Sequence, residues 1–168
     1  MNPTQLSREL REETSPDLTR RRWLVGLSLV GAAMGAAVTL YQTGIIKHLP
    51  DPPLSLFDSD RVDASNYAYK RMDSPDAPMM LISYGVTALL ASMGGKDRAE
   101  EKSWVPLALA AKTVFDSALA LKLGQEEWAE NKALCAYCQV ATLASLASIA
   151  LAAPEAVSAV RKLTDTVQ

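Results

Sequence analysis

Apolar positions along the chain gather into four runs, and the stretches between them hold most of the charged residues. Three of the runs contain no Asp, Glu, Lys or Arg: residues 23–46, 77–95 and 133–154. The remaining run, residues 104–121, is interrupted only by Lys112 and Asp116. The first run is long enough to cross the roughly 30 Å hydrocarbon core of a bilayer, and the run at 77–95 is marginally long enough.

Each run is predicted to be helical. None shows the alternation of apolar and polar residues that marks a strand, and Ala and Leu are the most frequent residues. The start of the first helix is well marked, because Ser15 can cap it, Pro16 suits the first helical position and Asp17 favours the positive end of the helix dipole.

A helix of a soluble bundle would show a charged face, which the first and fourth runs lack. Tryptophan and tyrosine residues stand at the ends of the runs, where amphipathic rings occupy a membrane interface, and Gly31 and Gly35 permit close helix packing. The sequence therefore predicts an all-α fold, a four-helix transmembrane bundle in contact with membrane lipid. A net charge of −2 argues against nucleic acid as a partner. The aromatic residues concerned are Trp23, Tyr41, Trp104 and Trp128.

Basic residues in the connecting segments predict the orientation, because they are more frequent on the cytoplasmic side. An N-terminus inside places ten of them inside and six outside, and Arg20, Arg21 and Arg22 directly precede the first span. We therefore expect a polar cytoplasmic segment (1–19), a membrane domain (20–155) with an outer loop at 47–77, and a cytoplasmic tail (156–168). A second outer loop is expected at about 123–132. The inner set is Arg8, Arg11, Arg20, Arg21, Arg22, Lys96, Arg98, Lys102, Arg161 and Lys162, and the outer set is Lys47, Arg61, Lys70, Arg71, Lys122 and Lys132.

The segment from Thr19 to Leu24 also resembles a twin-arginine export signal. A cleaved signal would have a shorter apolar region and a clear small-residue cleavage site. The first run is long and three more apolar runs follow it. Both features favour the interpretation that the arginines hold the N-terminus on the inner side of the membrane.

Both cysteines, Cys135 and Cys138, fall at the start of the fourth helix, at the outer face and on the oxidising side if the host is a bacterium. A spacing of three places them on one helical face, within reach of a disulfide. The helix N-terminus and nearby Lys132 favour a thiolate. Glu126 and Glu127 oppose it if they fold close.

Other uses of a Cys-x-x-Cys pair find little support. A thioredoxin fold needs alternating strands and helices, and a c-type haem site needs His where the chain has Gln139. A zinc site needs four ligands, and His48 is the only histidine, so we predict no metal. The open alternatives are a redox pair and a structural pair of small buried residues.

Cys135-Ala136-Tyr137-Cys138, opening the last helix of a four-helix membrane bundle, resembles the vitamin K epoxide reductase family. The loop segment Asp58-Ser59-Asp60-Arg61-Val62-Asp63-Ala64-Ser65 is similar to the one that precedes that family's second helix. The resemblance implies a membrane thiol–quinone oxidoreductase in which the cysteine pair cycles between dithiol and disulfide. It also implies a quinone as electron acceptor, a separate thioredoxin-like protein as partner, Cys138 nearest the quinone, and Cys135 as its resolving partner.

Members of that family usually carry a second cysteine pair in the outer loop, which passes electrons to the catalytic pair. This chain has Ser59 and acidic residues there and no loop cysteine. Because thiol–disulfide exchange runs from sulfur to sulfur, an internal relay is impossible. Either an external thiol reaches Cys135 directly, or the chain is a non-catalytic bundle or accessory subunit on the same scaffold, with a structural disulfide.

Two further groups are candidate quinone contacts. Lys112 and Asp116 stand one turn apart and either form an ion pair inside the bundle, or provide a proton path or a contact to a quinone carbonyl. In the outer loop, Ser65, Asn66 and Tyr67 either cover a quinone cavity or simply solvate the loop.

Overall fold

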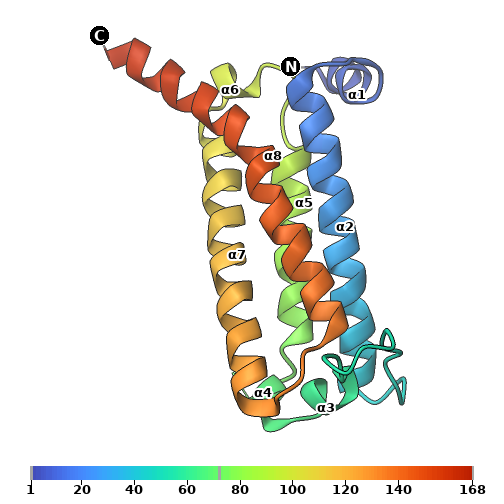
Figure 1. Ribbon diagram of the computed structural model, residues 1–168. Helices are drawn as coiled ribbons and strands as arrows, with labels where there is room; N and C mark the ends of the chain where they lie inside the picture. The colour runs from blue at the N-terminus through green and yellow to red at the C-terminus, as the bar shows by residue number, and fades with distance from the viewer. Residues whose placement is uncertain (1, 72, 168) are drawn as a thin grey trace.

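The computed structural model describes residues 2–71 and 73–167, and in this part of the chain all regular secondary structure is helical. Four long helices run side by side as a bundle (Figure 1): α2 (Pro16–Gln42), α5 (Ala77–Ser92), α7 (Trp104–Asn131) and α8 (Ala136–Val167). Four short helices lie at its ends: α1 (Pro3–Glu12), α3 (Ser59–Asp63), α4 (Asn66–Tyr69) and α6 (Arg98–Glu101). The prediction of an all-α, four-helix membrane bundle is confirmed.

Three of the long helices, α2, α7 and α8, are long and apolar enough to cross a bilayer. The fourth, α5, has 16 residues and is therefore about 24 Å long, shorter than the hydrocarbon core. It ends at Ser92 because the chain turns at Gly94, whose φ of +79° lies in the left-handed region. The second apolar run, which reaches Gly95, is therefore not helical to its end.

Two helices extend beyond their apolar runs. Helix α7 continues to Asn131 and ends at Lys132, whose φ is +54°, so the predicted loop at 123–132 is wrong. Glu, Ala and Gln are good helix formers and fill much of this stretch. Helix α8 continues through Pro154 to Val167, past the end of the fourth apolar run.

Both termini lie at one end of the bundle, together with α1 and α6 (Figure 1). Helices α3 and α4 and the start of α8 lie at the opposite end. We call these the terminal end and the loop end. The arrangement agrees with the predicted placement of both termini on one side, and the assignment of that side to the cytoplasm stays a prediction. The Ser15 cap is present, with the Leu18 amide donating to Ser15 Oγ at 3.1 Å.

Small residues bring α2 and α5 together. A Cβ added at Gly31 would lie 2.4 Å from the ring of Tyr84, and one at Gly35 would lie 3.1 Å from the backbone nitrogen of Leu81. Any side chain at Gly31 would therefore displace the Tyr84 ring. The Tyr84 hydroxyl reaches α8, where it lies 2.7 Å from Ser145 Oγ. The predicted role of both glycines in close packing is confirmed.

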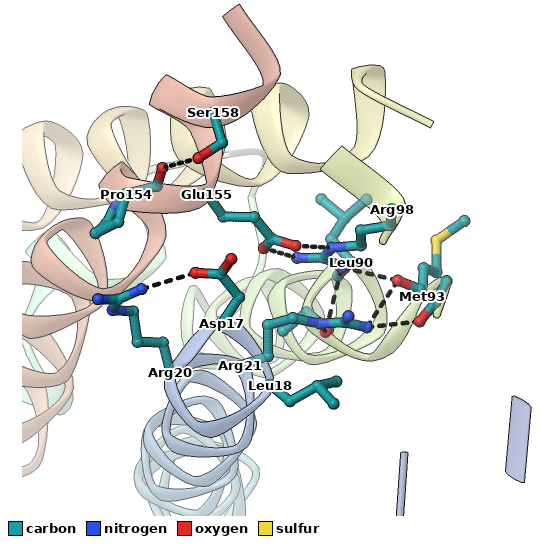
Figure 2. Close-up of polar contacts among 12 residues, drawn as sticks. Asp17, Leu18, Arg20, Arg21, Leu90, Met93, Arg98, Pro154, Glu155 and Ser158 are labelled. Atoms are coloured by element: carbon teal, nitrogen blue, oxygen red, sulfur yellow. Dashed lines mark hydrogen bonds and ion pairs between the residues drawn. The ribbon is translucent and has the colours of Figure 1, made fainter. Parts of the chain in front are cut away.

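Two buried arginines close the terminal end (Figure 2). Arg98 forms a two-point ion pair with Glu155 of α8, at 2.7 Å through Nε and 2.6 Å through Nη2. Arg21 of α2 donates to a carbonyl oxygen in the last turn of α5, where a helix leaves carbonyls without partners, and to three carbonyls of the turn that follows. Arg21 is thus a buried structural group. The count of basic residues that predicts the orientation nevertheless includes it on the inner side, with Arg20 and Arg22. The acceptors of Arg21 are the carbonyls of Ala91, Met93, Gly94 and Gly95, at 2.8–2.9 Å.

Candidate active site at the loop end

Cys135 lies directly before α8 and acts as the cap of this helix. Its Sγ accepts a hydrogen bond from the Cys138 amide at 3.2 Å, as a capping side chain does. The next free amide, that of Ala136, donates to Ser59 Oγ at 3.0 Å. Ser59 is fully buried and donates in turn to Asp51 at 2.6 Å. The outer loop therefore fixes the start of the helix that follows Cys135 and carries Cys138.

The outer loop also covers Cys135. Leu56 and Asp58 pair with the backbone of Leu134 at 3.0 and 3.1 Å, and this short bridge holds the loop against the segment before Cys135. Cys135 is 0% exposed, whereas Cys138 is half-buried, and both are free thiols in the structure. An external thiol can therefore reach Cys135 only after the loop moves.

Each cysteine lies beside a buried carboxyl group. A carboxylate oxygen of Asp63, from α3, and the two cysteine sulfurs lie within 4.8 Å of one another. Glu127 of α7 lines the same cavity as Cys138 and accepts from the Cys135 amide at 3.4 Å. We call these four side chains, Asp63, Cys135, Cys138 and Glu127, the carboxyl–thiol row. Asp63 and Glu127 are each only 3% exposed.

Burial governs the protonation of this site. It raises the pKa of Asp63 to about 7, and the hydrogen bond from Cys135 offsets only part of that rise. For Cys135, the hydrogen bond from Cys138 lowers the pKa, but burial and the charge of Asp63 together outweigh it and leave the pKa raised. The carboxyl that raises the thiol pKa is thus Asp63, a residue that the sequence did not single out as a neighbour.

An apolar cavity of about 430 Å³ opens beside Cys138, between α4, α5, α7 and α8. Its walls are mainly apolar, with polar groups near the loop end, such as Arg71 and Glu127, and others deeper in the bundle, such as Asp116 and Ser145. Two other hollows, of about 460 and 490 Å³, lie along α1 and are lined by polar surface side chains such as Arg8. An apolar cavity with a few polar groups is the usual form of a small-molecule site. Its lining includes Tyr67, Met80, Tyr84, Phe115, Leu119, Glu127 and Cys138.

The predicted quinone contacts divide into two groups. Tyr67 and Asp116 line the cavity, and Lys112 is held beside it, paired with Asp116 and donating to Ser83 at 2.8 Å. Ser65 and Asn66 do not line it: Ser65 donates to the Val62 carbonyl at 2.7 Å, and Asn66 is exposed at the start of α4.

Sequence reasoning did not select Asp63 or Glu127 as site residues. Asp63 belongs to the loop segment that carries the family resemblance, but its position there does not reveal its contact with Cys135. Arg71 was also not selected; it lines the cavity, and its Nη1 is buried with no hydrogen bond, 3.6 Å from Asp76.

Asp63, Cys135 and Cys138 bring three possible donor atoms within 4.8 Å of one another. Structural zinc sites use four protein ligands, and we assign no metal to this group. The sequence prediction that the chain has no metal site stays a prediction.

Comparison with known proteins assigns most of the chain to a family. The model of the vitamin K epoxide reductase family matches residues 22–153, which include all four long helices in large part and the whole loop end. No curated protein and no solved structure matches the chain.

Proposed function

The chain belongs to the vitamin K epoxide reductase family, and from this membership and the place of its cysteines we propose that it is a membrane thiol–quinone oxidoreductase. Cys135 and Cys138 would cycle between dithiol and disulfide against a quinone held in the cavity. The observation that carries the proposal is that Cys138 lines the apolar cavity while its sulfur neighbours Cys135.

The cavity suits a quinone in size and in chemistry. A volume of about 430 Å³ lies within the usual range of about 300–1,000 Å³ for small-molecule sites. The ring would lie among Phe115, Leu119 and Met80, and a quinone oxygen near the loop end would find Arg71 as a donor. Tyr67 faces the same space, but its hydroxyl already donates to the Leu123 carbonyl at 2.9 Å.

The reaction balances without further groups. When the two thiols form a disulfide, the S–S bond forms, two S–H bonds break, and two electrons and two protons leave the pair. A quinone that takes two electrons and two protons becomes a quinol. Cys138 would give electrons to the ring, and Cys135 would close the disulfide.

The disulfide would be reduced by a separate thioredoxin-like protein. Because Ser59 stands where the loop meets α8 and the loop has no cysteine, this partner's thiol must reach the pair itself. Cys135 becomes accessible if the backbone bridge between Leu56, Asp58 and Leu134 opens. We place the pair at the outer face of a bacterial inner membrane, with both termini in the cytoplasm.

The proposal is tested with the purified protein in lipid nanodiscs, reduced and freed of reductant, then mixed with a soluble short-chain quinone. We expect quinone absorbance to fall as the disulfide forms, and Cys138→Ser to abolish both changes. Cys135→Ser should leave a stalled protein that does not turn over. Ser92→Ala, at the far end of α5, is the control and should behave as the wild type.

A second candidate is a non-catalytic bundle or accessory subunit in which the cysteines form a structural disulfide. The complete burial of Cys135 favours it. In that case the pair would stay oxidised whatever the state of the added quinone, and the double replacement by Ser would lower stability without changing quinone absorbance.

A further inference from the structure

The carboxyl–thiol row contains two buried acids with no cationic partner. Within residues 2–71 and 73–167, no Lys, Arg or His side chain forms an ion pair with Asp63 or Glu127. The neighbouring acids of α7 differ: Glu126 lies 2.6 Å from Arg71, and Glu130 pairs with Lys70. Of these three acids of α7, Glu127 therefore faces the thiols, whereas the other two face a basic side chain.

Such an arrangement is costly unless the acids carry protons. A buried carboxylate without a cation loses its hydration and gains little in return. Asp63 Oδ2 is also buried without a hydrogen-bond partner. Buried acids of this kind, placed beside reactive groups, are typical of sites that hold and move protons.

Glu127 has the contacts that a proton carrier needs. Its carboxylate accepts from Gln139 Nε2 at 3.2 Å and from the Cys135 amide at 3.4 Å, and it interacts with the Cys138 thiol. It lines the same cavity as Cys138. One carboxyl group thus lies beside both the thiols and the space proposed for the quinone.

We propose that Glu127 is a catalytic residue that carries the proton of Cys138 to the quinone, while Asp63 takes the proton of Cys135. This inference rests on the proposed function. It divides the two thiol protons between two acids, one on the cavity side and one on the loop side.

The proton balance is as follows. On oxidation, the two electrons pass from the forming disulfide to the quinone, and protonated Glu127 gives its proton to one quinone oxygen and takes the proton of Cys138 in its place. Protonated Asp63 releases its proton to water on the loop side and takes the proton of Cys135. The second quinone oxygen takes a proton from water, so that both acids end the step protonated.

The other titratable and charged groups around the row set the field in which this transfer occurs. The negative charges of three outer-loop acids, Asp51, Asp60 and Asp76, raise the pKa of Asp63. Glu127 feels Asp63 across the thiols, and it interacts with the buried Tyr67 of α4. Two cations lie near: Arg71 and Lys70 lie over the Tyr67 ring at 4.9 and 5.0 Å. Arg71 is held by Glu126 and Asp76, and Lys70 by Glu130.

The test compares Glu127→Gln with Glu130→Gln, a matched change one turn along the same helix. Oxidation of the reduced protein by a soluble short-chain quinone is followed in nanodiscs from about pH 5 to pH 9 by stopped flow. We expect Glu127→Gln to slow the reaction by about 10²- to 10⁴-fold, the usual range for a lost acid–base group. It should also change the pH profile. Glu127→Asp should restore part of the rate, and Glu130→Gln should match the wild type.

A Glu127→Gln protein with the rate and pH profile of the wild type would overturn the inference while leaving the proposed function intact. A wild-type protein that does not reduce the quinone would overturn both. If Glu127→Gln does not fold, the wild type still decides: dicyclohexylcarbodiimide, which modifies protonated carboxyls in apolar surroundings, should label Glu127. Added quinone should block that label, and its absence from Glu127 would refute the proton-carrying role.

Discussion

The two ends of the bundle differ in whether their buried acidic side chains have a basic partner. At the terminal end, the Glu155 carboxylate is matched by the Arg98 guanidinium, and the donors of Arg21 are taken up by backbone carbonyls (Figure 2). At the loop end, Asp63 and Glu127 are as deeply buried but face thiols and no base. A paired buried charge holds a structure in one arrangement, whereas an unpaired acid changes its protonation readily.

The same difference separates two acids on α7. Glu126 and Glu127 are adjacent in sequence, yet one pairs with Arg71 and the other contacts Cys138. The helix turns about 100° between them, so that the first points to the loop and the second to the interior. Under the proposed function, the terminal end serves stability and the loop end serves chemistry.

The largest effect is expected from breaking the matched pair at the terminal end. Arg98→Met leaves the Glu155 carboxylate buried without a partner and should lower the free energy of unfolding by about 3–5 kcal/mol. The double change Arg98→Met, Glu155→Leu should recover much of that loss, because no charge remains unpaired. Thermal unfolding of the purified proteins in detergent measures both. If the double variant were as unstable as the single one, the loss would lie in the carbonyl contacts of Arg98 instead.

A smaller, pH-dependent effect is expected at the loop end. The pKa of Asp63 is raised from 3.8 to about 7 by burial, so the folded protein binds this proton more tightly than the unfolded chain. Stability should therefore be highest at acid pH and fall as the pH rises through the interval from 3.8 to about 7. The loss contributed by Asp63 is about 4 kcal/mol at most, from a shift of about three pH units.

Asp63→Asn should remove this dependence and make the protein more stable than the wild type above pH 7. Unfolding midpoints across the interval would show it, and Asp58→Asn, in the same loop but exposed, serves as the control. Parallel pH profiles for the wild type and Asp63→Asn would mean that the Asp63 carboxyl keeps its charge throughout.

The smallest effect is expected where the loop caps α8. Ser59→Ala removes the acceptor of the Ala136 amide and the donor to Asp51, and it should lower the free energy of unfolding by about 1 kcal/mol. Because the cap also holds the loop over Cys135, alkylation of Cys135 by a water-soluble reagent should become faster. An unchanged alkylation rate would show that the backbone bridge at Leu134 alone covers this cysteine.

The sequence by itself determined the features that depend on neighbours in the chain. The apolar runs predict four helices, Ser15 and Pro16 predict the start of α2, and the spacing of Cys135 and Cys138 predicts that the two lie together at the start of α8. Each follows from local periodicity or capping, which needs no knowledge of the rest of the fold. The family resemblance adds the scaffold, because its motifs also lie in short segments.

The tertiary structure alone decided which distant residues meet. Asp63 reaches Cys135 only because the outer loop folds back over the start of α8, and Arg21 reaches the end of α5 only because α2 and α5 pack at Gly31 and Gly35. Such contacts join segments far apart in the chain, and a hydropathy pattern does not specify them. Burial then settles the protonation of Asp63 and Cys135, since the cost of a charge depends on the solvent and partners that the whole fold leaves around it.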